Sequence, residues 1–240
     1  DAAQTHQVTS PYDRSKTVGS VQWTTREQAE KAIDAAWAAF PDWEATPVKQ
    51  RADILRRFAD LMEEHLAELM ALCSREGGKL LTDGVDEIRE AVDFCRYYAV
   101  RAEEIFGEPT ELPGPTGESN RLHMGGKGVF AAISPWNFPL AIFTGPAAAA
   151  LAAGNTVIAK PAEQTPLIAA LAVKLCHEAG IPEEVFQLLP GGGEVGQLIT
   201  NDPRIAGVSF TGSTATAQAI NRGLAAREGP IATLIAETGG

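Results

Sequence analysis

The stretch Val129-Phe-Ala-Ala-Ile-Ser-Pro-Trp-Asn-Phe-Pro139 decides the fold of this chain. Its first five residues form a short apolar run typical of a buried strand, and two prolines then stiffen the turn that follows. From Gly128 onward the same order repeats: a short apolar strand, a turn of glycine or proline, and a helix. Because parallel strands need crossover connections, this alternation predicts an α/β fold with a doubly wound parallel sheet.

The predicted strands and helices of this sheet indicate where a ligand would bind. We expect strands at residues 129–133, 156–160, 185–189, 207–211 and 231–237, the last of them buried. We expect helices at residues 140–153, 165–179, 194–200 and 214–226. Ligands of these sheets bind beyond the carboxyl ends of the strands, so the residues that follow each strand are the candidates.

The chain before this alternating region has a helical pattern. After an extended segment at 17–23, apolar residues at one-face spacing predict a helix that ends in a turn at 41–47 and a second that ends at Gly77-Gly78. A third helix is expected over 85–105, and prolines and glycines then predict a protruding β-hairpin. We therefore divide the chain into a helical part of the nucleotide-binding domain (1–107), a hairpin flap (108–127) and a Rossmann-like core (128–240).

Composition excludes several classes of function. The net charge of −11 disfavours nucleic acid and anionic membranes as partners. The uncharged run 128–159 is long enough to span a bilayer, but prolines and glycines interrupt it, so we expect no membrane span. Cys73, Cys95 and Cys176 lack metal-ligand spacing, which predicts no metal site and favours reduced thiols in a cytoplasmic protein. The chain begins with Asp1 and has no signal peptide, which favours a fragment.

Two motifs follow the second and third strands. In Lys160-Pro-Ala-Glu163, the cation and the carboxylate are suited to the two hydroxyls of a ribose, and Glu163 would repel a ribose phosphate, which favours NAD over NADP. An exposed surface ion pair explains the same residues equally well. Gly191-Gly-Gly-Glu-Val-Gly196 matches G-x-G-x-x-G, but no carboxylate ends the next strand at Thr211. We therefore favour a tight strand-to-helix turn there.

Two more motifs follow the fourth and fifth strands. Phe210-Thr-Gly-Ser-Thr214 opens a helix whose free N–H groups would attract phosphate, although capping by Ser213 and Thr214 is a sufficient explanation. Ile235-Ala-Glu-Thr-Gly-Gly240 carries Glu237 out of the last strand. Poor solvation there would make Glu237 a usable base, and a strand-end acid that faces water is the alternative.

Together these motifs carry a family resemblance. Pro135-Trp-Asn-Phe-Pro139, Lys160-Pro-Ala-Glu163, Phe210-Thr-Gly-Ser-Thr214 and Glu237-Thr-Gly-Gly240, in this order, resemble the aldehyde dehydrogenase superfamily over nearly the whole chain. Residues 90–98, 145–160 and 162–168 are similar to the module of bifunctional proline-oxidising bacterial enzymes that oxidises L-glutamate γ-semialdehyde to L-glutamate. The alternatives are an aldehyde dehydrogenase of other specificity and a nucleotide-binding module without chemistry.

The resemblance assigns roles to individual residues. Asn137 would donate its side-chain amide to the oxyanion that forms when a cysteine thiolate attacks the aldehyde, and Glu237 would activate water against the resulting thioester. Phe138 would contact the aliphatic chain of the substrate, and Glu90 would lie near its amino group. A larger set would contact NAD: Ile133, Ser134, Pro135, Trp136, Lys160, Pro161, Glu163, Gly193, Phe210, Thr211, Gly212, Ser213 and Gly239.

The chain also departs from the family pattern. Ala217 replaces the second glycine of the turn Gly-x-Thr-x-x-Gly, and none of the three cysteines matches the nucleophile. We therefore expect the nucleophile and the catalytic domain beyond Gly240, and a fragment that is inactive alone. The resemblance further implies pairing of like subunits through the flap and a linked flavin-dependent proline dehydrogenase domain.

Overall fold

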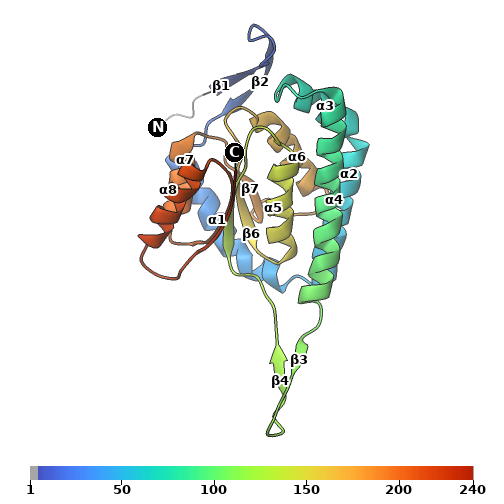
Figure 1. Ribbon diagram of the computed structural model, residues 1–240, viewed down its shortest axis with the longest axis vertical. Coiled ribbons are helices and arrows are strands. Elements are labelled where there is room, and N and C mark those ends of the chain that lie inside the picture. The colour runs from blue at the N-terminus through green and yellow to red at the C-terminus, as the bar shows by residue number, and fades with distance from the viewer. Residues whose placement is uncertain (1–4, 240) are drawn as a thin grey trace.

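A parallel sheet forms the centre of the protein (Figure 1). It has five strands in the order β7-β6-β5-β8-β9. The computed structural model describes residues 5–239, so Asp1 and Gly240 lie outside the described residues. The strands are β5 (Val129–Ile133), β6 (Thr156–Lys160), β7 (Phe186–Leu188), β8 (Ile205–Gly212) and β9 (Thr233–Thr238). They lie within two residues of the predicted ranges, and the predicted α/β fold is confirmed.

Helices cover both faces of the sheet (Figure 1). On one face, α5 (Ala141–Ala152) and α6 (Pro166–Glu178) connect β5 to β6 and β6 to β7. On the other face, α7 (Gly193–Asn201) and α8 (Thr214–Ala225) pack beside the N-terminal helix α1 (Arg26–Ala45). Because the chain leaves β7 at one edge and returns at β8 beyond β5, the winding reverses next to β5, where ligands of such sheets bind.

On the face that carries α5 and α6, the half of the sheet formed by β8 and β9 lacks a helical cover. The core beneath α5 and α6 takes its strand residues from β5, β6, β7 and the residue before β7, and none from β8 or β9. Strand β9 is an edge strand with a single neighbour, and its last four residues are exposed. The prediction of a buried strand over 231–237 is therefore wrong, because strand burial depends on the path of the crossover helices.

The first helix runs further than predicted. It starts at a capping box in which Thr25 and Gln28 bond each other's backbone, and it continues through Pro41 to Ala45. Trp43 is buried and donates its indole N–H to the carbonyl of Leu151 at 3.2 Å. Packing of Trp43 thus outweighs the cost of about 3 kcal/mol for an interior proline, and the predicted turn at 41–47 begins too early.

The second predicted helix is two helices, α2 (Val48–Glu64) and α3 (Leu66–Arg75), separated at His65. At His65 the ψ angle opens to 18°, which ends α2. Helix α4 (Leu81–Phe106) begins four residues before the predicted third helix and packs against α2 and α5. Residues before α1 form an antiparallel pair, β1 (Thr5–Thr9) with β2 (Thr17–Gln22), of which only the second strand was predicted.

The predicted hairpin is confirmed and projects from the body of the molecule (Figure 1). Strand β3 (Thr110–Leu112) pairs antiparallel with β4 (Asn120–Leu122). Leu112, Leu122 and Met124 on this flap are exposed. Among residues 5–239, no helix combines the length and the apolar character that crossing a membrane requires.

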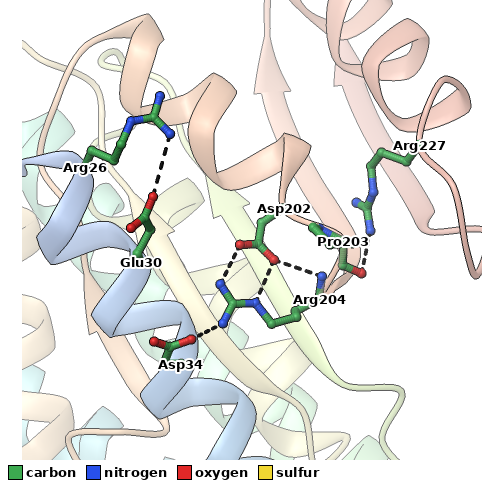
Figure 2. Close-up of polar contacts among 7 residues, drawn as sticks. All are labelled: Arg26, Glu30, Asp34, Asp202, Pro203, Arg204 and Arg227. Atoms are coloured by element: carbon green, nitrogen blue, oxygen red, sulfur yellow. Dashed lines mark hydrogen bonds and ion pairs between the residues drawn. The ribbon is translucent and has the colours of Figure 1, made fainter.

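The amino end of β8 is fixed by a cluster of charges (Figure 2). The guanidinium of Arg204 bonds Asp202 at 2.6 and 2.8 Å and also pairs with Asp34 of α1. Arg227 donates to the carbonyls of Pro203 and Ile205, both at 2.9 Å. These contacts lie at the opposite end of the strands from the candidate site, so they fix α1 and the end of α8 against the sheet.

Candidate active site

A cavity of about 300 Å³ lies between α7 and α8 at the carboxyl ends of β5 and β6. Three residues predicted to contact a cofactor line it together: Ile133, Lys160 and Gly193. The remaining lining residues were not predicted: Gly196, Gln197, Thr200, Asn201, Thr216, Ala219, Ile220 and Gly223. Most of these are small or apolar residues within helices, where the sequence pattern indicates only ordinary packing.

Lys160 is buried at one side of this cavity. Its ammonium donates to the carbonyls of Pro161 at 2.9 Å and Gly191 at 2.8 Å. Burial lowers the pKa of Lys160 below its ordinary value, while the carboxylate of Glu163 acts in the opposite direction. The alternative of an exposed surface ion pair is wrong, because Lys160 is only 6% exposed.

The glycine run Gly191–Gly196 shapes the same region. The predicted strand-to-helix turn is confirmed, since it joins β7 to α7. A side chain on Gly192 would place its Cβ 3.7 Å from Oε1 of the exposed Glu163, and Gly193 faces open space. A Cβ on Gly196 would lie 3.5 Å from the chain of Lys160. The glycines therefore keep backbone close to the side chains of Lys160 and Glu163, a role that the turn interpretation did not include.

The loop 134–139 leaves the central strand β5 at the same rim. Its first N–H, from Ser134, donates to the carbonyl of Lys160 at 3.2 Å. The Ser134 hydroxyl is buried and has no hydrogen-bond partner among the described residues. Pro135 is half-buried, whereas Trp136, Asn137 and Phe138 are exposed. The loop therefore presents an indole, an amide and a phenyl ring at the rim.

A second cavity, of about 470 Å³, lies on the uncovered side of β8 and β9. Phe94 and Tyr98 from α4, Ile142 from α5, and Ile235 and Glu237 from β9 are among its lining residues. The structure thus places Glu237 between an apolar wall and solvent.

The surroundings of Glu237 differ from the prediction. The hydroxyl of Thr211 donates to its Oε2 at 3.4 Å, and the carboxylate is exposed. The expectation of poor solvation is wrong, because β9 is an edge strand whose last four residues are exposed. In the described structure, Glu237 matches the alternative interpretation, an acid at a strand end that faces water.

Glu90 projects from α4 toward the same region. Partial burial raises its pKa, and the carboxylates of Glu87 and Glu237 raise it further, against the opposing effect of Lys79. Phe94 and Tyr98, four and eight residues after Glu90 on α4, line the cavity that Glu237 also lines. Glu90 therefore lies on the side of α4 that faces this cavity.

The remaining predicted contacts take up different positions. Phe210 is buried in the core, and its ring would meet a Cβ on Gly212 at 2.6 Å. The Ser213 hydroxyl accepts the N–H of Thr216 at 3.2 Å, which confirms the capping of α8. Thr211 is half-buried, and Gly239 has open space beside it. Pro161 is buried and contributes its carbonyl to Lys160.

The three cysteines lie in the core, away from the rim. All are buried and free. Burial raises the pKa of Cys73 to about 12 and raises the pKa values of Cys95 and Cys176 as well. Because a thiolate is the reactive form, none of them is poised for nucleophilic attack.

Comparison with known proteins shows which proteins this chain resembles in sequence and structure. The chain is 47% identical, over 100% of its length, to the bifunctional protein PutA of Escherichia coli (strain K12) and spans 17% of that protein. It is 57% identical to a crystal structure of bifunctional proline utilization A (PutA), with a TM-score of 0.90 over 92% of this chain and 23% of that chain.

A second solved structure, 1-pyrroline-5-carboxylate dehydrogenase from Thermus with bound NAD, has a TM-score of 0.95 and 36% identity. The match covers 100% of this chain and 47% of the Thermus chain. The aldehyde dehydrogenase family model matches residues 1–240. The predicted family resemblance is thereby confirmed, and the chain belongs to the aldehyde dehydrogenase family.

Proposed function

We propose that this chain is the coenzyme-binding part of an NAD-dependent enzyme that oxidises L-glutamate γ-semialdehyde to L-glutamate. The observation that carries the proposal is the gathering of Asn137 and Glu237 at one rim. Asn137 follows the carboxyl end of β5, and Glu237 lies at the carboxyl end of β9; β5 pairs in parallel with β8, and β8 pairs in parallel with β9. An amide donor and a carboxylate acceptor therefore lie at the same end of the sheet, beside a cavity.

The two residues have complementary roles in this proposal. The neutral amide of Asn137 donates a hydrogen bond to the aldehyde oxygen as negative charge develops there, without neutralising a nearby nucleophile. Glu237 accepts a proton from water, and its exposure at the end of β9 gives water access to it. Phe138 is 40% exposed and supplies an apolar surface for the aliphatic part of the substrate.

The described residues fit NAD. Bound NAD would accept the hydride that leaves the aldehyde carbon. The cavity between α7 and α8 is narrow and has the glycines and apolar side chains that suit a flat base. Two of the three N–H donors of Lys160 are used by carbonyls, which leaves one for a ribose hydroxyl. The first N–H groups of α8 are suited to a diphosphate, with Ser213 at the cap.

The exposed carboxylate of Glu163 supports NAD over NADP. It lies beside Gly192, within the region that Lys160 borders, and would repel a ribose phosphate. The similar proteins name both coenzymes. The Thermus structure contains bound NAD, whereas the succinate-semialdehyde dehydrogenase [NADP(+)] of E. coli, 41% identical over 86% of this chain, names NADP. That similarity also motivates a second candidate substrate, succinate semialdehyde.

The wider assembly is part of the proposal. The relatives called PutA are bifunctional and much longer than this chain, which supports a proline-oxidising flavin domain in the same polypeptide. The exposed Leu112, Leu122 and Met124 of the flap support pairing of like subunits through that hairpin. The nucleophilic cysteine would belong to another part of the polypeptide, because Cys73, Cys95 and Cys176 are buried and inert.

Turnover by the full-length protein tests the proposal. We expect a higher kcat/KM with NAD for glutamate semialdehyde than for succinate semialdehyde or for simple aliphatic aldehydes. Asn137→Ala should lower kcat about a hundredfold or more, the usual cost of one oxyanion donor. A preference for succinate semialdehyde would overturn the substrate. Full activity of Asn137→Ala would overturn the assigned chemistry, and a folded protein that oxidises no aldehyde would favour a nucleotide-binding module.

A further inference from the structure

The loop that carries Asn137 is held at its far end by a buried carboxylate. Helix α5, which follows the loop, has no side-chain cap of its own. Glu87 from α4 supplies one: its Oε1 accepts the N–H groups of Leu140 and Ala141, both at 2.9 Å. The Glu87 side chain is 0% exposed. One oxygen of Glu87 therefore fixes the start of α5, and the other is left for a second partner.

That partner is Lys79, in the short connection between α3 and α4. Its ammonium lies 2.5 Å from Oε2 of Glu87 and donates to the backbone carbonyl of Asn137 at 2.9 Å. The same ammonium stands 4.1 Å from the centre of the Phe138 ring. The side chain of Lys79 is 13% exposed, so these contacts are protected from most solvent. Lys79 thus binds the backbone of one candidate catalytic residue and the ring of its neighbour.

These contacts exceed what folding of α5 requires. Glu87 alone satisfies the first N–H groups of the helix, and Lys79 makes no contact with them. The loop residues Trp136, Asn137 and Phe138 are exposed, so burial does not fix them. A cation that anchors the Asn137 carbonyl fixes the peptide plane that contains the Asn137 Cα, and so restricts the position from which the side-chain amide extends.

We propose that Lys79, held by Glu87, is a positioning residue that aims the Asn137 amide and the Phe138 ring at the aldehyde. This inference rests on the proposed function, because it gives the loop a reaction to serve. Lys79 acts through Asn137 and does not touch the substrate. Loss of Lys79 leaves the amide present but misdirected, and a misplacement of about 1 Å costs on the order of a hundredfold in rate.

A double-mutant cycle in the full-length protein tests the proposal. Lys79→Met keeps most of the unbranched side chain and removes the ammonium group and its charge. We expect it to lower kcat with glutamate semialdehyde by roughly ten- to a hundredfold, with the dissociation constant for NAD unchanged. In an Asn137→Ala background the same substitution should cost less than about threefold, because the group that it aims is already gone. Lys79→Arg, which keeps a cation, should recover most of the rate.

The control is Lys31→Met on α1, where the lysine is exposed and, among residues 5–239, pairs only with the exposed Glu27. It should leave kcat unchanged in both backgrounds. Equal fold-losses from Lys79→Met with and without the Asn137 amide would overturn the positioning role, and so would a wild-type rate for Lys79→Met. If Lys79→Met lowers the unfolding temperature, Glu87→Gln goes through the same cycle, and additivity there overturns the positioning role equally.

The proposed function and this inference fail in different ways. If Asn137→Ala alone is fully active, the chemistry assigned to the loop is wrong. If Asn137→Ala lowers kcat strongly and Lys79→Met lowers it by the same further factor as in wild type, the assigned chemistry stands and only the positioning role is wrong.

Discussion

At the scale of single residues, Glu76 is a buried carboxylate with an unusual pKa. It caps helix α6 from outside, accepting the N–H groups of Leu167 at 2.7 Å and Ile168 at 2.9 Å. Burial raises the pKa of Glu76 to about 7, although these two N–H groups act in the opposite direction. A buried carboxylate that serves a helix N-terminus thus remains protonated over part of the physiological pH range.

This raised pKa predicts a pH dependence of stability. An unfolded chain releases the Glu76 proton near pH 4.5, whereas the folded chain keeps it until about pH 7. The folded state therefore binds more protons between these values, and the free energy of unfolding falls as pH rises through this window, by up to about 3 kcal/mol. Glu76→Gln keeps an oxygen acceptor and should remove this decline.

The measurement is urea unfolding at pH 5 and pH 8. The loss of unfolding free energy between the two should be larger for wild type than for Glu76→Gln. Glu183→Gln, at an exposed position before β7, should behave as wild type does. An identical decline in all three proteins would show that Glu76 does not hold a proton in the folded state.

The sequence predicted the site residues that follow strands. It did not predict the buried carboxylates that cap helices distant in the sequence. Asn137, Lys160 and Glu163 stand at strand ends, where local pattern and sheet topology point to the rim. Glu76 and Glu87 bond backbone groups 91 and 53 residues away, respectively. No periodicity records such a contact, because the helices that they cap carry no local sign of a missing cap.

At the scale of elements, the existence of strands and helices followed from apolar spacing, but their limits depended on packing. The entry to β5 shows the difference. Gly128 has φ +140°, and a Cβ there would lie 2.9 Å from the Cβ of Ala206 in β8. Asn155 fixes this entry by accepting the N–H groups of Lys127 at 2.6 Å and Gly128 at 3.1 Å. The glycine is thus required by its conformation and by the approach of β8.

Replacing Gly128 by alanine should therefore destabilise the central strand. The strained backbone and the steric contact together should lower the free energy of unfolding by about 1–3 kcal/mol. Gly84→Ala in α4 is the matched control. A Cβ there would lie 3.8 Å from Cys73 and Met70 of α3, which is an ordinary packing distance. Helix propensity should make that change neutral or stabilising by up to about 1 kcal/mol. Denaturant unfolding compares the two, and equal effects would contradict the argument.

At the scale of the whole molecule, the winding of the sheet sets where each cavity lies. The chain reverses beside β5, so the cavity between α7 and α8 lies on one face and the cavity lined by Glu237 on the other. The loop with Asn137 leaves β5 between them. Sequence alone predicted the rim but not the uncovered face, because strand patterns do not say which half of a sheet its crossovers leave open.

This arrangement predicts how coenzyme stabilises the full-length protein. A ligand at a hundred times its dissociation constant raises the free energy of unfolding by about 2.7 kcal/mol. NAD should do so and NADP at the same concentration should do less, because Glu163 repels the ribose phosphate. Glu163→Gln removes both the repulsion and a charged acceptor for ribose hydroxyls. It should therefore weaken the thermal shift with NAD and strengthen the shift with NADP, as scanning calorimetry would record.

A neighbouring carboxylate provides the control for this last prediction. Glu194 is exposed in the first turn of α7, and its carboxylate lies 3.8 Å from the position of a Cβ on Gly192. Glu194→Gln therefore changes the charge of the same rim by the same amount, without removing the residue that pairs with Lys160 in the proposed ribose site. If the two variants shift the NAD and NADP responses equally, general charge explains the preference. If only Glu163→Gln reverses it, the result places the ribose between Lys160 and Glu163, where one carboxylate can both hold the hydroxyls and exclude the phosphate.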